Sequence, residues 1–255
     1  MYKTYSLFLL LWAGLLMAET PQEKALRLVT EIDAANSGFQ GEYAELEMVL
    51  INAYGDQTVR KLTSETTEVE GDGDRSVSTF LWPADVKGTR MLTWSHKTGD
   101  DDQWLYLPAL KRVKRISSRN KSGAFMGSEF SYEDMGSQEI EEYTYVFDAE
   151  ENIEGRPCWK ISRDPVSKKS GYSKEVVWYD QEYMNPLRVE YYDRKGELLK
   201  VAIFFDYKKI DRWWRIGRIE MNNEQTHKKS ILTWKERELS RAYNEDHFAS
   251  DSLVD

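Results

Sequence analysis

Hydrophobic and polar residues alternate along most of this chain, but one segment near the start has helical spacing. In residues 23–36 the apolar positions recur at spacings of three and four, as on one face of an α-helix. These positions are Ala25, Leu28, Val29 and Ile32. Thr20 and Pro21 before them are a start signal, and Gly38 after them is a stop signal. We therefore predict a single helix over residues 23–36.

Almost all of the remaining chain has the period-two pattern of β-strands. The strand-like segments are separated by breaks that contain Gly, Asp or Pro. In the first half they are residues 42–52, 57–69, 75–82, 89–97 and 103–107. After residue 139 they are TYVFD, CWKIS, EVVWYD, LRVEYYD, LKVAIFFDYKKI, RIGRIEM and KSILTWKE. Strands at this spacing, without helices between them, predict an antiparallel meander and hence a sandwich or an open barrel.

Several of the predicted strands have one strongly apolar face. In residues 198–207 that face carries Leu199, Val201, Ile203, Phe205 and Tyr207. We expect three further sets to lie on such a face. The first is Leu187 with Val189 and Tyr191, the second is Val176 with Trp178, and the third is Leu105 with Leu107. Such a face must be covered, and the chain offers only the predicted helix and the non-strand segment 117–136. We expect a curved sheet wrapped around one helix and an irregular lid.

The N-terminal residues have the pattern of an export signal. Lys3 precedes an apolar run over residues 6–17, and Ala18 stands before a polar stretch. The run is shorter than the roughly 20 residues that span a bilayer, which argues against a membrane anchor. We predict a cleavable signal over 1–18, a single domain over 19–245 and a polar tail over 246–255. The expected location is the periplasm.

The composition excludes several classes of protein. The chain has 35 Lys and Arg, 44 Asp and Glu, three His and one Cys, and its formal net charge is −9. Cys158 alone cannot form an internal disulfide, and so few His and Cys cannot supply a zinc-finger or Cys-rich site. The acidic balance argues against a nucleic-acid partner. We expect no metal and no cofactor.

No catalytic arrangement emerges from the sequence. The G-x-S-x-G pattern of a nucleophile elbow does not occur. His96 and His227 flank strands beside Lys residues, and His247 falls in the expected tail. Asp100 to Asp102 fits a solvated turn better than a calcium loop, which needs spaced oxygen ligands. Counting carboxylates does not by itself exclude a glycosidase pair, but we predict that the protein is not an enzyme and has no catalytic residues.

A run of cations interrupts the acidic chain between residues 111 and 121, where no acid occurs. One interpretation is a solvated edge strand, protected by charge against pairing with another sheet. The other is a docking patch for phospholipid headgroups or for an acidic surface of a membrane protein. The candidate docking residues are Lys111, Arg112, Lys114, Arg115 and Arg119.

The same region carries a recognisable signature. The run WLYLPALKRVKRI, followed by FMGSEFSYED, resembles the signature of the outer-membrane lipoprotein-sorting family related to LolA. The matching positions are Trp104, Tyr106, Leu107, Pro108, Arg112, Arg115, Phe125, Met126, Gly127, Ser128, Phe130, Tyr132 and Asp134. Glu129 stands where Asp is more usual. The strands of residues 185–200 and 207–221 also resemble the closing strands of the family, so the resemblance spans roughly residues 20–240.

This resemblance implies a mainly β fold with covering helices: an unclosed antiparallel β-barrel of the LolA/LolB type with a helix and loop lid. It implies a periplasmic carrier that shields lipid or lipoprotein acyl chains in an apolar cavity. The expected partners are acyl chains and an inner-membrane exporter, for which the resemblance implies the RND type, or an outer-membrane acceptor. The alternative for each candidate lining residue is a place in the core beneath the lid. The candidates are Met91, Leu105, Leu107, Phe125, Met126, Phe130, Trp178, Tyr191, Ile203, Phe205 and Met221.

Two other classes of protein remain open at the sequence level. A β-sandwich carbohydrate-binding module could use exposed aromatic residues such as Trp213 and Trp214. A non-catalytic interaction subunit would instead fill the interior with its own side chains.

Overall fold

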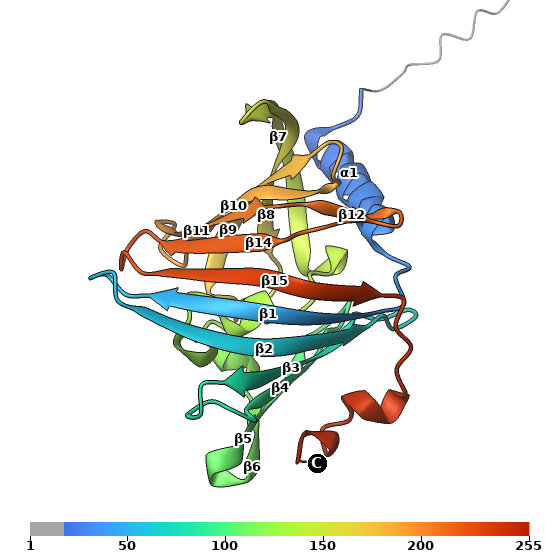
Figure 1. The fold of residues 1–255 in the computed structure, drawn as a ribbon. Helices are drawn as coiled ribbons and strands as arrows, with labels where there is room; N and C mark the ends of the chain where they lie inside the picture. Colours follow the sequence, from blue (N-terminus) through green and yellow to red (C-terminus); the bar gives the residue numbers. More distant parts are fainter. Residues whose placement is uncertain (1–17, 255) are drawn as a thin grey trace, which may run out of the picture.

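One strongly curved antiparallel sheet dominates the computed structural model, which describes residues 18–254 (Figure 1). In the described chain the sheet has 13 strands in the order β6-β5-β4-β3-β2-β1-β15-β14-β11-β10-β9-β8-β7. Its strands are β1 Gly41–Ile51, β2 Gln57–Thr67, β3 Arg75–Trp82, β4 Arg90–Trp94, β5 Asp102–Leu107, β6 Arg112–Ile116, β7 Tyr143–Ile153, β8 Arg156–Pro165, β9 Tyr172–Asp180, β10 Asn185–Asp193, β11 Leu198–Phe205, β14 Arg218–Asn223 and β15 Lys229–Leu239. The edge strands β6 and β7 do not pair with each other, so the prediction of an unclosed antiparallel sheet is confirmed.

The helix α1 spans Pro21–Asn36 and confirms the helix prediction. It begins two residues before the expected start because Pro is tolerated in the first turn. Thr20 caps it: its Oγ accepts a hydrogen bond from the Glu23 amide at 3.2 Å, and the Glu23 carboxylate accepts from the Thr20 amide at 2.8 Å. The expected face is buried, and α1 packs against β7.

Two predicted strands are each broken in two. The segment 199–210 becomes β11 and the short β12 Lys208–Ile210, and the next segment becomes β13 Trp213–Arg215 and β14. At the break, Asp206 adopts a left-handed conformation with φ of 59°. Gly217 lies so close that a Cβ there would be 2.6 Å from the Asp206 carbonyl oxygen. The strands β12 and β13 therefore form a separate two-stranded hairpin.

The lid, defined here as residues 117–142, consists of loops and short 3-10 turns. These turns are Ser118–Asn120, Phe125–Gly127, Tyr132–Met135 and Ile140–Glu142. Phe125 and Phe130 of the lid belong to the main hydrophobic core together with α1 and one face of the sheet. The prediction that residues 117–136 cover the sheet without forming a strand is confirmed, and the lid extends to residue 142. We call the covered face the inner face.

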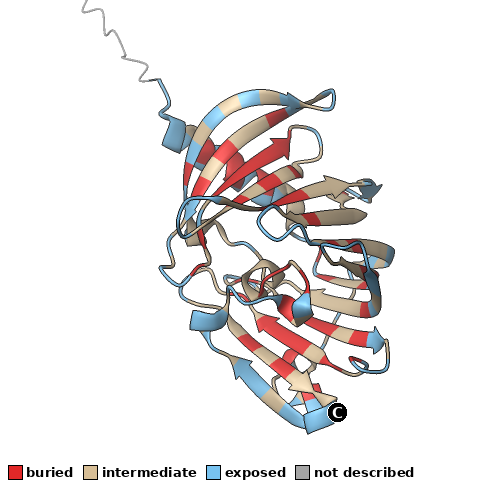
Figure 2. Cartoon of the chain, turned by 90° about the vertical axis from the view of Figure 1, so that its left-hand side faces the viewer, coloured by how far each residue is buried: buried red, intermediate tan, exposed pale blue. Residues whose placement is uncertain are grey.

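Buried and more exposed residues alternate along the strands (Figure 2), but both faces of the sheet carry apolar clusters. On the outer face of β9, Val176 and Trp178 pack with Cys158 and Leu187. Their neighbours Val177 and Tyr179 face the main core instead. The expectation that Val176, Trp178 and Leu187 share the covered inner face is therefore wrong.

The face prediction for residues 198–207 is also wrong. Ala202 pairs with Val189 and with Met221, and all three lie in the main core. Directly opposed residues share a face of a sheet, so Lys200, Ala202 and Phe204 point inward. Ile203 and Phe205 alternate with them and point outward.

The C-terminal segment covers a second outer cluster. Phe248 and Leu253 are buried against Val77 and Leu92 of β3 and β4. The Trp94 indole N–H donates to the carbonyl oxygen of Phe248 at 2.7 Å. The segment expected to be a polar tail is thus folded onto the sheet, because two apolar residues among its polar ones are enough to anchor it.

Two further observations concern export. The predicted signal over 1–18 lies outside the described residues except for Ala18, so the structure does not bear on it. From residue 18 to residue 254, no helix has the length and apolar character needed to cross a membrane.

Candidate functional site

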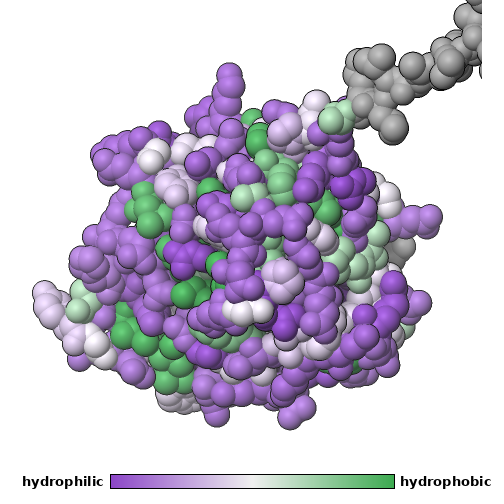
Figure 3. All heavy atoms as spheres, turned by 90° about the horizontal axis from the view of Figure 1, so that it is seen from above, coloured by the Kyte–Doolittle hydropathy of each residue, from purple (hydrophilic) through white to green (hydrophobic). Residues whose placement is uncertain are grey.

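A cavity of about 420 Å³ lies on the inner face, between α1, the lid and the sheet. Most of its wall is apolar. The apolar lining comes from Val29 and Ile32 of α1, Phe130 and Ile140 of the lid, and Val177, Val189, Tyr191, Phe204, Ile219 and Met221 of the sheet. Seen from above, most of the surface is hydrophilic, and hydrophobic residues show in separate patches between polar side chains (Figure 3). A partly open cavity with a mostly apolar wall suits an aliphatic chain.

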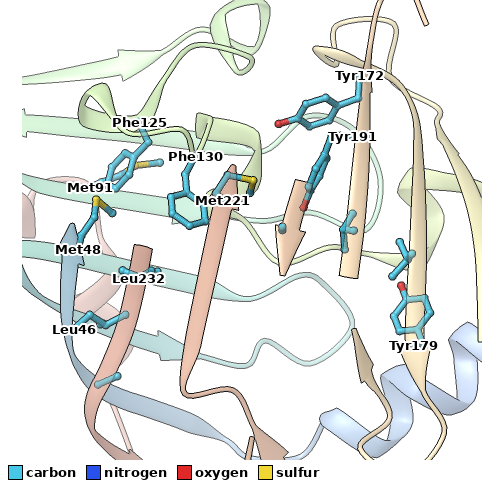
Figure 4. Close-up of a cluster of buried hydrophobic side chains, with 14 of the residues drawn as sticks. Leu46, Met48, Met91, Phe125, Phe130, Tyr172, Tyr179, Tyr191, Met221 and Leu232 are labelled. Carbon is cyan, nitrogen blue, oxygen red and sulfur yellow. The ribbon is translucent and has the colours of Figure 1, made fainter. Parts of the chain in front are cut away.

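The structure separates the predicted lining residues into three groups. Phe130, Tyr191 and Met221 line the cavity (Figure 4). Met91, Leu105, Leu107, Phe125 and Met126 lie in or against the main core under the other half of the lid, and they do not line this cavity. Trp178, Ile203 and Phe205 lie on the outer face, so their assignment to an inner cavity is corrected.

A second hollow of about 420 Å³ lies at the edge of the lid. It is bounded by lid residues 128–131, by Tyr172, and by Arg194 and Lys195 of the β10–β11 turn. Phe130 lines both this hollow and the apolar cavity. The side chain of Phe130 therefore stands between the two spaces.

A polar cleft of about 740 Å³ adjoins the apolar cavity, with which it shares Asp33, Asn36, Gln138 and Asn185. Acids outnumber cations along it. Its charged residues are Asp33, Glu42, Glu68, Glu70, Asp72, Asp74, Glu139, Lys97 and Arg215. The cavity therefore has an acidic cleft at its side.

Within the cleft, burial raises the pKa of Asp74 to about 7, and the nearby charges of Glu139, Glu68 and Asp33 add to the shift. In the unfolded chain this pKa returns to near 3.8. Between pH 3.8 and about 7 the folded state therefore holds a proton that the unfolded state has lost. The contribution of this group to stability falls as the pH rises through that range.

We expect the Asp74→Asn variant to melt several degrees above the wild type at pH 8 and to lose most of that advantage at pH 5. The neutral amide removes the cost of ionising a buried carboxyl beside other acids. Thermal unfolding followed by circular dichroism across this pH range tests it, with the exposed Asp211→Asn as control. An Asp74→Asn melting temperature equal to that of the wild type at pH 8 would contradict the prediction.

The lid is tied to the sheet by a buried ion pair. Lys200 of β11 lies 2.6 Å from a carboxylate oxygen of Asp134 in the lid, and their side chains are only 4% and 6% exposed. The Lys200 ammonium also donates to the carbonyl oxygen of Glu129 at 3.0 Å. Asp134 accepts further hydrogen bonds from the Tyr172 hydroxyl at 2.8 Å and from the Ser131 amide at 2.6 Å. All donors around this carboxylate come from the lid or from the inner face of the sheet.

Other residues of the signature fix the remainder of the lid. The Ser128 hydroxyl donates to the Phe125 carbonyl oxygen at 2.7 Å, which closes the turn between them. The Glu129 amide donates to the Ser230 hydroxyl of β15 at 2.9 Å. Glu133 accepts from the Gly171 amide at 2.9 Å, and burial raises the pKa of its carboxyl. The residues of the signature FMGSEFSYED therefore supply many of the contacts that hold the lid on the sheet.

A second buried ion pair borders the cavity. Arg163 of β8 lies 2.5 Å from Glu175 of β9, and the side chains are 5% and 1% exposed. Arg163 also donates to Gln138 of the lid. The sequence analysis missed Arg163, Glu175 and Lys200, because charges within strands are usually placed on the solvent face. Each of them is two residues from a core residue, Ile161, Val177 or Ala202, and this spacing indicates a position on the same inner face.

The candidate docking cations lie on exposed positions, and four of them belong to one hairpin. Lys111 is in the β5–β6 turn, and Arg112, Lys114 and Arg115 are on the edge strand β6. Arg115 pairs with Asp102. Arg119 lies apart from them, in the lid.

Metal ligands, a reactive thiol and histidines are among the groups that catalysis most often uses. From residue 18 to residue 254, no three His, Cys, Asp or Glu side chains come together as metal ligands would. Cys158 is buried, and burial raises the pKa of its thiol to about 11. His96 bonds Asp72 at 2.8 Å and His247 bonds Glu65 at 3.0 Å, both away from the apolar cavity.

An open, curved sheet whose inner face is covered by one helix and a lid defines the LolA-like class of folds. A solved domain described as an outer membrane lipoprotein-sorting protein, from Vibrio parahaemolyticus, is 45% identical, with a TM-score of 0.90, and covers 92% of this chain and 100% of its own. A DUF1329 family protein from Desulfovibrio piger is 30% identical, with a TM-score of 0.88, over 92% of this chain and 99% of its own. The chain belongs to this family of outer membrane lipoprotein-sorting proteins, as the signature predicted.

A more distant solved structure supports the fold assignment. A LolA superfamily protein from Nitrosomonas europaea is 18% identical, with a TM-score of 0.72, over 89% of this chain and 98% of its own, and it shares the fold. A family model described as "Uncharacterized protein" matches residues 72–255. Among curated proteins there is no significant match.

Proposed function

We propose that this protein is a periplasmic carrier that shields the acyl chains of a lipid or lipoprotein between the inner and the outer membrane. The observation that carries the proposal is the apolar cavity between α1, the lid and the inner face of the sheet. Family membership supports it, because the Vibrio relative is described as a lipoprotein-sorting protein. We further propose that an inner-membrane exporter of the RND type supplies the cargo and that an outer-membrane acceptor receives it.

The chemistry of the cavity suits such a cargo. Each methylene group moved from water into an apolar site contributes about 0.8 kcal/mol, so ten of them contribute about 8 kcal/mol before the cost of ordering the chain. Met221 adds a flexible, polarizable side chain that adapts to irregular contacts. The polar residues of the lining lie beside its apolar wall, and Asp134 and Arg163 among them are already paired with Lys200 and Glu175, which leaves the apolar surface as the main feature that a ligand can contact.

We expect the Val189→Trp variant to lose at least tenfold in affinity for a fluorescent fatty-acid probe. Val189 is 3% exposed and lines the cavity, so an indole there occupies the space of the ligand. The matched control is Ile203→Trp, on the outer face of the neighbouring strand β11. Circular dichroism melting checks that both variants fold.

The same experiment includes the natural cargo. Wild-type protein purified from the periplasm should yield lipid or acylated peptide on native mass spectrometry and organic extraction. No recovered lipid together with no probe binding would reject the carrier function. Equal probe binding by Val189→Trp and the wild type would place the ligand elsewhere.

The carbohydrate-binding alternative has less support. The Trp213 side chain is 7% exposed and donates to the Ser37 carbonyl oxygen at 3.0 Å. Trp214 packs on Tyr183, with ring centroids 4.4 Å apart. These rings do not form an open platform for a sugar, and we expect no signal on a glycan array.

A further inference from the structure

Exposed hydrophobic side chains gather at one end of the sheet. The strands β1 to β6 are consecutive and antiparallel, so the β1–β2, β3–β4 and β5–β6 turns all lie at the same end, towards the left and lower left of Figure 1. Tyr54 is 93% exposed, Trp82 50%, Leu81 45% and Leu110 68%. These are four of the eight exposed large hydrophobic residues found between residues 18 and 254.

Exposed cations lie in two of these three turns. Lys87 lies in the β3–β4 turn, and Lys111, Arg112 and Lys114 lie in the β5–β6 hairpin, all exposed. None of these four forms an ion pair with the described residues, whereas Arg115 pairs with Asp102. Two exposed acids, Asp56 and Asp85, lie in the same turns. Positive charge therefore prevails at this end of a protein whose formal net charge is −9.

A hollow of about 430 Å³ in the β5–β6 hairpin is lined by both apolar and cationic side chains. Its walls are Leu107, Leu110, Arg112, Val113, Lys114 and Arg115. Apolar side chains beside cations match an amphiphile whose head is anionic. Trp and Tyr prefer the boundary between headgroups and hydrocarbon, and Lys and Arg are attracted to anionic headgroups.

The opposite ends of the same strands are acidic. The β2–β3 turn there contributes Glu68, Glu70, Asp72 and Asp74 to the acidic cleft. A molecule charged in this way is oriented by a negative surface, which attracts the cationic end and repels the acidic one. The β10–β11 turn, which borders the hollow beside Phe130, lies at the same end of the sheet as the β1–β2 turn (Figure 1).

We propose that the end formed by the three turns, with Tyr54, Leu81, Trp82, Leu110 and the cations around them, docks on an anionic lipid bilayer. The apolar side chains enter the headgroup region and the cations contact lipid phosphates. Docking in this orientation brings the hollow beside Phe130 towards the membrane, so that cargo can pass at the edge of the lid. The inference goes beyond the carrier function, and its test does not involve the cavity.

The test is co-sedimentation with vesicles. We expect the wild type to bind vesicles of equal parts phosphatidylglycerol and phosphatidylethanolamine, and to bind phosphatidylcholine vesicles at least tenfold more weakly. The Lys111→Glu/Lys114→Glu variant should lose at least tenfold in affinity for the anionic vesicles. The Trp82→Ser/Leu110→Ser variant should lose several-fold in affinity for the anionic vesicles. In high salt, where the cations contribute less, it should bind these vesicles more weakly than the wild type does.

Matched controls are available elsewhere on the surface. Lys208→Glu/Lys209→Glu reverses two exposed charges on β12, and Val146→Ser removes an exposed apolar side chain on β7. Both should bind vesicles as the wild type does. Wild-type protein that fails to bind anionic vesicles at low salt overturns the proposal, as does undiminished binding by both turn variants. Fatty-acid probe binding is measured in parallel, so a failure of docking is distinct from a failure of the carrier function.

Discussion

Replacing Lys200 with Met is expected to lower the free energy of unfolding by about 3–5 kcal/mol, the usual cost of leaving one partner of a buried ion pair uncompensated. The Asp134 carboxylate would keep its bonds to Ser131 and Tyr172 but lose the charge that balances it. Because Asp134 belongs to the lid, the loss should also loosen the lid. Urea unfolding at neutral pH measures the first effect, and limited proteolysis of the lid measures the second.

The double variant Lys200→Met/Asp134→Asn separates charge from packing. With both charges removed, most of the lost stability should return, since a neutral pair carries no desolvation penalty. Arg188→Met is the matched control, because the Arg188 side chain is 34% exposed and its pair with Glu190 should be worth at most about 1 kcal/mol. A double variant no more stable than Lys200→Met alone would show that the ion pair is not the source of the effect.

Truncating Phe125 to Ala is expected to cost about 3–5 kcal/mol, as for other fully buried Phe residues. Phe125 is 0% exposed, and its ring lies 5.7 Å from that of Phe80 on the sheet and 6.0 Å from that of Tyr132 in the lid. Removing it leaves a void where the lid meets the inner face. Denaturant unfolding measures the loss.

The control for this truncation is Tyr54→Ala, which removes an aromatic side chain that is 93% exposed and should change stability by less than about 0.5 kcal/mol. If Phe125→Ala were as stable as Tyr54→Ala, the lid would not be part of the folded core. Faster proteolysis in residues 117–124, with unfolding otherwise unchanged, would show that the lid opens as a separate unit.

The parts of the fold that the sequence predicted are those set by local periodicity. Helical spacing located α1, and period-two segments located nearly every strand. The signature located the lid because its residues are adjacent in the chain. At Asp206 and Gly217 the strands end although the alternating pattern continues. The left-handed backbone of Asp206 and the close approach of Gly217 break the strands there.

The faces of the strands could not be read in the same way. Periodicity shows which residues share a face but not which face is inside, and here both faces carry apolar clusters. The faces of β11 were predicted wrongly for this reason. Its outward Ile203 is apolar, whereas its inward Lys200 is charged and buried. The partner that makes a buried lysine acceptable, Asp134, is 66 residues away in the sequence.

The two unpaired edges of the sheet have a mechanical consequence. In a closed barrel the strand number and stagger fix the diameter, and widening it breaks hydrogen bonds between strands. Here β6 and β7 share no hydrogen bonds, and Ile116 of β6 and Tyr145 of β7 pack against a core that includes side chains of the lid and of α1. A small change in twist, spread over many strands, can therefore enlarge the interior while every interstrand hydrogen bond remains intact. In the proposed carrier, such a sheet would let one set of lining residues accommodate acyl chains of different lengths.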